Sequence, residues 1–299
     1  MVIALLLLAV GLAANVLLGP LGLGLLTWRV SANGLNQTYG ADAAILVMVV
    51  PAALVAARLW WRGQRLAAPL ALGAGLAALY YGIAEVLGPD YTRYPGNNER
   101  YFPLFLAVII LSWTIAARAW GALDPEPPRP AAWLARSFAT VLVLGGALIG
   151  LAWTAQIGAI ALTGTVGPEY TDAPSAFWTI RIVDLGFLVP ICLATGVGLW
   201  RGSALAVRAA YGVAAFMTLQ AAAVLAMGAV MLWRDDPAAS AALFSALLPI
   251  TLGFAACTLA LLRSYANGGG QAADPTTRVA RARAPQANPP ATGRALPRR

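Results

Sequence analysis

Long apolar runs separated by short polar segments make up most of the chain. Runs of about 20 apolar residues are long enough to cross a bilayer core about 30 Å thick. The pattern therefore predicts an all-α integral membrane protein with eight transmembrane helices. The expected spans are residues 2–27, 43–61, 66–87, 102–120, 138–163, 182–200, 204–233 and 239–262.

One segment of the chain occurs twice. The seventeen residues that begin at Pro51 align with those that begin at Pro190, 139 positions later, and seven of them are identical. Apolar composition does not explain the shared spacing between the proline and the W-R-G triplet. We therefore expect two four-helix repeats, residues 1–120 and 136–263, joined by a Pro-rich connector at 121–135. Because four spans is an even number, both repeats should face the same way in the membrane.

Composition narrows the class of protein. Hydrophobic residues make up 60% of the chain and charged residues only 11%, against about 25% in soluble domains. The basic residues are all arginines that interrupt apolar runs, so we do not expect nucleic acid as a partner. The absence of histidine excludes histidine-ligated haem, zinc and copper sites. We expect no cofactor, no metal site and no disulfide framework.

Arginine placement predicts the orientation. If both termini are inside, fifteen of the twenty arginines lie on the inner side, which is typical of a cytoplasmic N-terminus. We expect a multi-pass protein of the cell membrane with both termini cytoplasmic. The tail at 264–299, rich in Gly, Pro, Ala and Arg, is expected to be disordered. Its arginines could bind anionic lipid headgroups beside the bilayer, or the tail could serve only as a solubilising extension.

Asp184 and Arg181 are the first candidate site residues. Asp184 lies inside an apolar run, where a carboxylate costs roughly 2.5 kcal/mol or more at a helix centre and therefore usually faces the bundle interior or a wet cavity. Arg181 precedes it by three residues and shares its helix face. Two interpretations follow: a local ion pair that anchors the helix start, or a ligand or proton site.

Glu85, Tyr80 and Tyr81 are the second group of candidates. Tyr81 lies four residues before Glu85 on the same helix face, so a carboxylate and two phenols could line the mouth of an outward-facing cleft. Anchoring of the helix at the membrane interface by tyrosine is the alternative. Asp42 is expected to favour a helix N-terminus through the helix dipole.

Several other residues are expected to serve packing. Asn15 and Gln156 should make hydrogen bonds between helices, and the Gly146-x-x-x-Gly150 spacing permits close helix approach. Pro51 and Pro190 should kink their helices because proline lacks the backbone N–H and clashes with the preceding turn.

A short resemblance concerns the second copy of the repeated segment. The sequence D-L-G-x3-P followed by G-x-G-L-W-R-G, residues 184–202, resembles a segment of bacterial polytopic membrane proteins of unassigned function. The resemblance covers about twenty to thirty residues. It implies a multi-pass helical protein and carries over no activity and no functional residue.

The leading functional hypothesis is transport or permeation of a small solute through the repeat interface, with the five candidate residues lining its outer entrance. An alternative is a non-enzymatic sensor or assembly partner that binds a ligand or a protein through its outer loops. A lipid-modifying enzyme would need its acids to gather at one surface, and these lie on four segments: Asp42, Glu85, Glu169, Asp172 and Asp184. No nucleotide-binding motif or nucleophile elbow is present, so we expect no catalytic residues.

Overall fold

The structure is a computed structural model that describes residues 1–267, and every regular element in that range is a helix. Seven helices are long and apolar enough to cross a membrane, and a further apolar helix at the N-terminus has 17 residues. The prediction of an all-α protein with several helices of membrane-spanning length is confirmed. Of the predicted tail, residues 264–267 are helical and residues 268–299 lie outside the described range.

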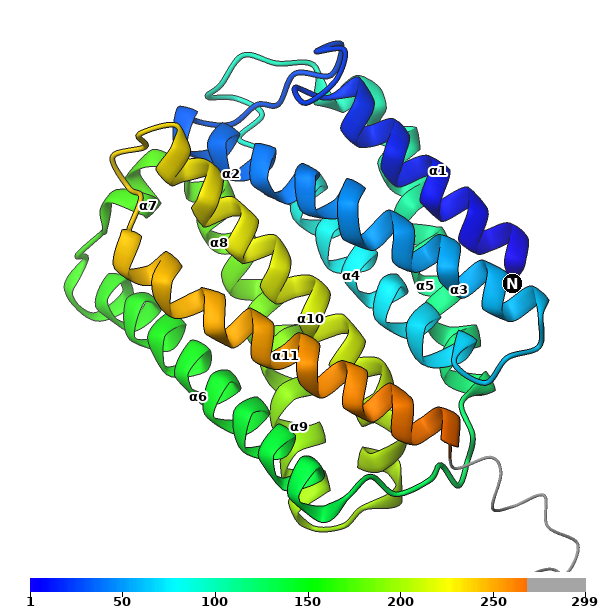
Figure 1. The fold of residues 1–299 in the computed structure, drawn as a ribbon. Helices are drawn as coiled ribbons and strands as arrows, with labels where there is room; N and C mark the ends of the chain where they lie inside the picture. Colours follow the sequence, from blue (N-terminus) through cyan, green and yellow to red (C-terminus); the bar gives the residue numbers. More distant parts are fainter. Residues whose placement is uncertain (268–299) are drawn as a thin grey trace, which may run out of the picture.

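The first half of the chain forms four helical rods, drawn in blue to blue-green in Figure 1. In the second rod, α2, η1 and α3 run on without a break, and η2 leads directly into α5. The elements are α1 (Val2–Leu18), α2 (Ala32–Ala44), η1 (Ile45–Val49), α3 (Val50–Trp61), α4 (Ala67–Leu87), η2 (Asn98–Tyr101) and α5 (Phe102–Ala122).

The second half forms four more rods and one short helix, α7. Here α8, η3 and α9 are continuous. The elements are α6 (Ala132–Thr163), α7 (Pro168–Asp172), α8 (Pro174–Val183), η3 (Asp184–Leu188), α9 (Val189–Trp200), α10 (Ala204–Trp233) and α11 (Ala241–Asn267). We call the end of the bundle formed by segments 19–31, 88–97, 164–173 and 234–240 the long-loop end, and the opposite end the short-loop end.

The predicted first span, 2–27, is too long. Helix α1 stops at Leu18, and Gly19 is extended, with a ψ of −169°. Proline disfavours the helical conformation in the residue that precedes it, and Pro20 follows Gly19 directly. The predicted span extended past this point because Leu21, Leu23 and Leu25 are apolar. In the structure all three are exposed in an irregular segment.

Other helices begin earlier than hydropathy predicts. The second rod begins at Ala32 rather than at residue 43, and the hydroxyl of Ser31 caps it by accepting a hydrogen bond from the Gly34 N–H at 3.1 Å. The sixth begins at Pro174 rather than at 182, with proline in its first turn. Helix α6 begins at Ala132, inside the predicted connector. In the second rod, the polar sequence from Asn33 to Thr38 hides the start from a hydropathy pattern.

Both repeated prolines follow a π-helical turn. The N–H of Val50 bonds to the carbonyl of Ile45, and the N–H of Val189 bonds to the carbonyl of Asp184. Since proline cannot donate to the turn before it, a wider turn relieves the conflict there. The irregularity expected at Pro51 and Pro190 therefore takes the form of a π-helical turn, and Asp184 is the first residue of the second one.

Helices α4 and α10 pack against each other where the two halves meet, with α2 against α10 and α8 against α4 (Figure 1). Glycines make this approach possible. A Cβ added to Gly73 would lie 2.5 Å from the Cβ of Ala215, and one added to Gly212 would lie 2.4 Å from Cδ2 of Leu72. Any side chain at either glycine would push the two helices apart.

The chain between α5 and α6 is held against α10 at the short-loop end. The guanidinium of Arg208 donates hydrogen bonds to the carbonyls of Trp120 and Leu123, at 2.7 and 3.0 Å, and lies over the Trp120 ring. The hydroxyl of Tyr211 donates to the carbonyl of Pro128. Side chains of α10 thus donate hydrogen bonds to backbone carbonyls at the end of α5 and in the connector.

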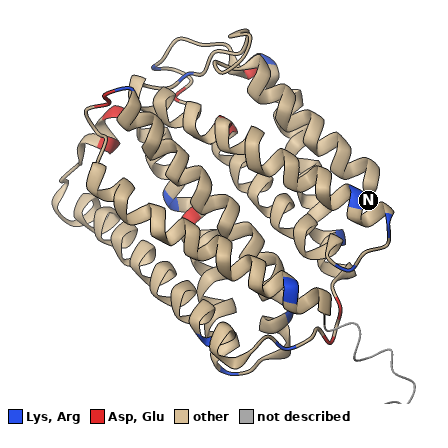
Figure 2. Ribbon diagram, viewed as in Figure 1, with Lys and Arg blue, Asp and Glu red and all other residues tan. Residues whose placement is uncertain are grey.

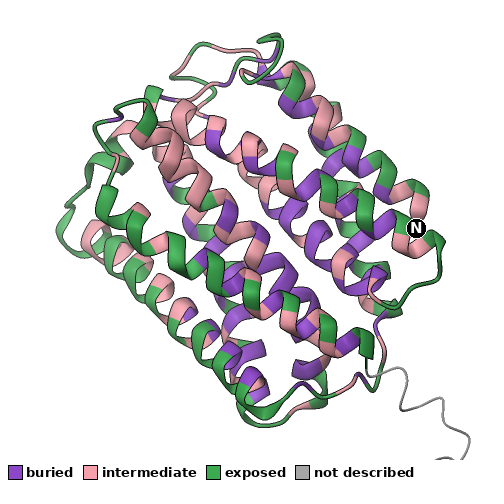
Figure 3. Cartoon of the chain, in the orientation of Figure 1, coloured by how far each residue is buried: buried purple, intermediate pink, exposed green. Residues whose placement is uncertain are grey.

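The distribution of side chains fits a bundle surrounded by lipid. Charged residues gather at the two ends of the molecule, with few between them (Figure 2). Large apolar side chains are exposed on outward helix faces, while the buried residues face the bundle interior (Figure 3). Ile3, Leu148, Leu162 and Leu205 are examples, each more than half exposed. In water such a surface would be unusual.

Candidate functional site

A cavity of about 430 Å³ lies between the two halves of the bundle. Its walls come from the second rod, α4, α6, the sixth rod, α10 and the start of α11. Most of the lining is apolar, with Ile45, Leu219 and Phe244 as examples. The polar side chains among the lining residues are Gln37, Tyr80, Tyr81, Trp153, Glu169, Asp184, Gln220 and Ser240.

Asp184 is buried at the cavity wall and is held by neutral donors. The hydroxyl of Tyr80 donates to its Oδ1 and the indole N–H of Trp153 donates to its Oδ2, both at 2.7 Å. The three residues come from η3, α4 and α6, so the contact joins the two halves of the chain. A carboxylate oxygen accepts more than one hydrogen bond, and both oxygens keep capacity for a ligand.

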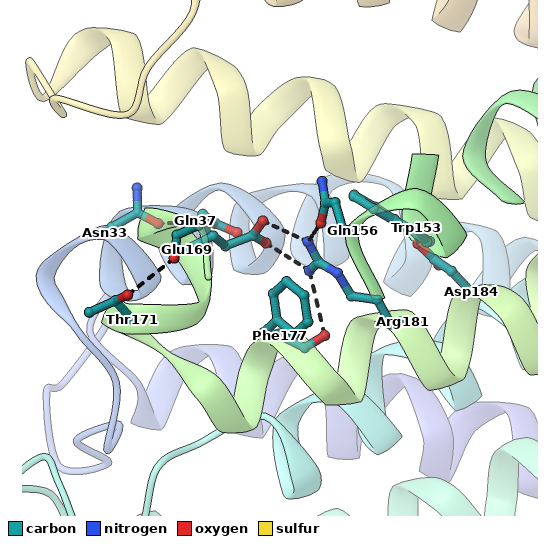
Figure 4. Close-up of polar contacts among 10 residues, drawn as sticks. Asn33, Gln37, Trp153, Gln156, Glu169, Thr171, Phe177, Arg181 and Asp184 are labelled. Atoms are coloured by element: carbon teal, nitrogen blue, oxygen red, sulfur yellow. Dashed lines mark hydrogen bonds and ion pairs between the residues drawn. The ribbon is translucent and has the colours of Figure 1, made fainter. Parts of the chain in front are cut away.

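Arg181 is one turn away from Asp184 but does not pair with it. Its guanidinium donates to both carboxylate oxygens of Glu169, at 2.8 and 2.7 Å, and to Oε1 of Gln156 at 2.5 Å (Figure 4). The interpretation of Arg181 and Asp184 as a local ion pair is therefore wrong. Glu169 lies on α7 and reaches the guanidinium from the long-loop end.

Aromatic rings complete the surroundings of Arg181, which is only 1% exposed. Its guanidinium carbon lies 3.7 Å from the centroid of the Phe177 ring and 4.2 Å from that of Trp153. Such stacking favours a cation removed from water. Trp153 therefore contacts Arg181 with its ring and Asp184 with its N–H, which fixes the relative position of the two charged groups.

A second polar cluster joins the first two rods to α4. The amide of Asn15 donates to Oε2 of Glu85 at 2.6 Å and lies 3.4 Å from the Tyr81 hydroxyl. Tyr81 in turn donates to Oδ1 of Asp42. We expected Asp42 to lie at a helix N-terminus, and this prediction is wrong. Asp42 lies well inside the rod that begins at Ala32 and is 1% exposed.

The two clusters line adjoining cavities. Glu85 lines a smaller cavity of about 160 Å³ that also touches Trp28, Gly88 and Pro89 at the long-loop end. Glu85 and Asp184 therefore do not line the same cavity. Tyr81 and Gln37 are lining residues of both.

The five predicted site residues thus divide into two groups. Tyr80, Asp184 and Arg181 belong to one cluster, while Tyr81 and Glu85 belong to the other. The two tyrosines are neighbours in sequence, but they bond to carboxylates on different elements, Asp184 on η3 and Asp42 on α2. The bonds of Asn15 to α4 and of Gln156 to α8 confirm that both make hydrogen bonds between helices.

Sequence reasoning missed the roles of Trp153 and Glu169. Trp153 lies in the middle of an apolar run, where an aromatic residue gives no sign of a polar partner. Glu169 lies in a polar loop, where acidic residues are common and do not indicate a site. The only available signal was indirect: a buried Arg181 needs an acid, and Glu169 is one of the few acids near it in the sequence.

Hydrogen bonds tie the long loops to one another. Arg29 donates to both carboxylate oxygens of Glu99, at 2.9 and 2.8 Å, and these hydrogen bonds raise the pKa of the guanidinium. Across the halves, the Tyr94 hydroxyl donates to the carbonyl of Asp172 at 2.7 Å. The polar groups of this end are therefore largely paired within the molecule.

Asp236 fastens the loop between α10 and α11 to α2. Its carboxylate accepts hydrogen bonds from the amides of Asn33 and Asn36, at 3.0 and 2.7 Å. Burial alone would raise the pKa of Asp236, but these hydrogen bonds and one from the Ala238 N–H lower it below its usual value. The carboxylate is thus kept ionised, and it holds the rim of the cavity at α2.

The lining of the large cavity carries more negative than positive charge. Within residues 1–267 no group of three or more His, Cys, Asp or Glu residues is placed to hold a metal ion. The large cavity has two carboxylates and no arginine among its described lining residues, so its field favours a positive charge. Comparison with known proteins gives no match to any family model, to any curated protein or to any solved structure.

Proposed function

We propose that the protein is an eight-span membrane protein in which a small organic cation binds in the central cavity and crosses the membrane between two parallel four-helix repeats. The observation that carries the proposal is Asp184: a buried carboxylate, bonded to neutral donors, at the wall of a cavity between the two halves.

Matched element bounds support the duplication. At the offset of 139 residues seen in the sequence, η1 (Ile45–Val49) corresponds to η3 (Asp184–Leu188), and α3 (Val50–Trp61) corresponds to α9 (Val189–Trp200). The first residues of α5 and α11, Phe102 and Ala241, differ by the same amount.

Individual glycines follow the same offset. Gly63 and Gly202 both adopt a left-handed conformation, with φ of 64° and 69°, after the W-R pair that ends α3 and α9. Gly73 and Gly212 hold equivalent places at the crossing of α4 and α10. Two copies of one four-helix unit, related by an axis that passes near this crossing, account for all of these matches. With 17 residues, α1 is about 26 Å long at 1.5 Å per residue and serves as the shortest span.

The lining of the cavity indicates the class of solute. Glu169 and Asp184 supply negative charge, and Arg181 neutralises only one of them. Tyr80, Tyr81 and Phe244 are aromatic residues of the mostly apolar lining, and aromatic ring faces attract cations. A volume of about 430 Å³ lies within the range of small-molecule sites, roughly 300–1,000 Å³. A small ammonium ion with apolar substituents fits all three features.

Flux measurements test this function. Proteoliposomes would be loaded with the protein and supplied with radiolabelled tetraethylammonium, tyramine, mannitol or methanesulfonate. We expect uptake of the two cations at least tenfold above that of mannitol and methanesulfonate, and loss of this uptake in Asp184→Asn. Glu126→Gln, which removes an exposed acid far from the cavity, is the matched control and should behave as wild type.

Two outcomes would contradict the proposal. One is cation uptake no greater than in empty liposomes, and the other is equal uptake of mannitol. Binding of a partner through the outer loops, the alternative predicted from the sequence, has less support because the loops pair with one another. Formation of a loop-dependent complex without any flux would favour that alternative.

A further inference from the structure

The cluster of Asn15, Asp42, Tyr81 and Glu85 has more hydrogen-bond acceptors than donors. Asn15 and Asp42 are 2% and 1% exposed. Three buried oxygens in the cluster have no hydrogen-bond partner among residues 1–267: Oδ1 of Asn15, Oδ2 of Asp42 and Oε1 of Glu85. Buried acceptors of this kind are rarely left unpaired, so the cluster lacks at least one donor.

The arginines of the long-loop end do not supply that donor. Their guanidinium groups are engaged elsewhere: Arg29 with Glu99, Arg93 with the Thr171 carbonyl, Arg181 with Glu169, and Arg234 over the Tyr39 ring, while Arg100 is exposed. Within residues 1–267, no hydrogen bond or ion pair joins a basic side chain to Asp42 or Glu85.

The other titratable groups on the neighbouring elements are also committed. Asp184 on η3 bonds to Tyr80 and Trp153, and Asp236 beyond α10 bonds to Asn33 and Asn36. The hydroxyl of Tyr91 donates to the Val86 carbonyl. Helix α1 contributes only the neutral Asn15 to the cluster. Among the described residues, Asp42 and Glu85 are therefore linked only through neutral groups, the Tyr81 hydroxyl on Asp42 and the Asn15 amide that contacts both Glu85 and Tyr81.

Two ionised carboxylates in this position would be costly. Removing each charge from water costs several kcal/mol even after relaxation, and like charges in one buried site add to that cost. No opposite charge in the described structure offsets it. Uptake of a single proton removes one charge and creates the O–H donor that the unpartnered oxygens lack.

We propose that Asp42 and Glu85 share one proton at neutral pH and form a proton-binding site. The O–H bond forms on a carboxyl oxygen of the pair, with the proton taken from water at the long-loop end by way of the smaller cavity that Glu85 lines. The proton belongs to the pair rather than to one residue. This inference stands apart from cation transport, because proton binding needs no solute.

Infrared difference spectroscopy tests the site directly. The protein in lipid nanodiscs would be measured at neutral pH, with Asp184→Asn as the background so that this acid contributes nothing. We expect a carboxylic acid C=O band, which ionised carboxylates lack. Glu85→Gln or Asp42→Asn should abolish the band. Only one acid then remains in the cluster, and it ionises because the new amide N–H supplies the missing donor. Glu126→Gln, the exposed control, should leave the band unchanged.

Failure of a variant to fold does not obscure the answer, because the band is first sought in the folded Asp184→Asn protein. Absence of the band there at neutral pH would overturn the proposal. A sodium site would overturn it as well: the melting temperature would then rise in NaCl relative to choline chloride, and this rise would disappear in Asp42→Asn. Proton binding with no cation flux would leave this inference intact and reject only the proposed function.

Discussion

At the scale of single residues, the planar guanidinium group of Arg181 is contacted both along its edge and on its faces. Glu169 and Gln156 accept hydrogen bonds from the edge of the guanidinium, and Phe177 and Trp153 cover its faces. Only a planar cation with several donors satisfies both requirements. Because Trp153 also bonds to Asp184, the position of the arginine controls that of the carboxylate.

We therefore expect Arg181→Lys to destabilise the protein although it keeps the charge. An ammonium group cannot bond to both oxygens of Glu169 and stack between two rings, and the lost charged hydrogen bonds are worth about 2 kcal/mol. The melting temperature in nanodiscs measures the effect. Arg129→Lys, at an exposed connector position, is the control and should leave the melting temperature unchanged. Equal melting temperatures for both variants would show that the surroundings of Arg181 contribute nothing specific.

The sequence identifies the unusual residues of the site but not their partners. A charge inside an apolar run is visible in any hydropathy pattern, which is why Asp184 and Arg181 could be selected. Their partners lie on other helices: Tyr80 is 104 residues from Asp184. From the sequence alone, Arg181 was expected to pair with the nearest acid on its own helix, Asp184. In the structure it pairs with Glu169, which lies on a separate short helix.

At the scale of elements, the crossing of α4 and α10 depends on small residues rather than on polar contacts. The backbone of α10 lies so close to Gly73 that an added Cβ would be 2.9 Å from the N atom of Phe216. Close backbone approach of this kind drives helix association in lipid, where apolar burial alone gives little preference between partners.

Gly73→Ala should accordingly destabilise the fold. Alanine favours a helix over glycine by about 1 kcal/mol, but overpacking costs about 1–3 kcal/mol. Gly253→Ala provides the contrast, because nothing lies within 4 Å of its added Cβ. Resistance to unfolding in SDS should fall in the first variant and hold or rise in the second. The same response from both variants would contradict a tight crossing at Gly73.

Helix boundaries show where hydropathy fails. The hydropathy pattern predicted a first span that continues through Pro20 and a second span that begins at residue 43. The observed helices end at Leu18 and begin at Ala32, because hydropathy measures polarity and ignores backbone conformation. The π-helical turns before Pro51 and Pro190 were foreseeable as irregularities, since proline disturbs the turn before it. Their π-helical form, rather than a simple kink, was not predicted.

At the scale of the whole molecule, several features of the first half recur in the second half at one sequence offset. The π-helical turns, the left-handed glycines and the crossing glycines belong to this set, and the parallel four-helix repeats proposed above would account for them. The sequence supplied the offset through its repeated segment. How the two units dock, and the cavity between them, depended on contacts that no single segment contains.

Accessibility labelling tests the parallel arrangement. In a background with Cys192→Ala and Cys257→Ala, single cysteines would replace Arg62, Arg201 or Tyr91. We expect a membrane-impermeant maleimide to label the Tyr91 variant in intact cells, and the other two only after the cells are opened. Labelling of Arg62→Cys and Arg201→Cys from opposite sides would rule out parallel repeats.

The hold of α10 on the connector bears on how a solute would leave. The cavity adjoins the long-loop end, so we expect that the proposed passage to the far side would separate the halves where Arg208 and Tyr211 bond to the carbonyls of Trp120, Leu123 and Pro128. Each such separation would strip these oxygens of their donors. In the proposed transport, the connector would act as a latch remote from the binding pocket, and we expect it to set how often the exit opens rather than how tightly the solute is held.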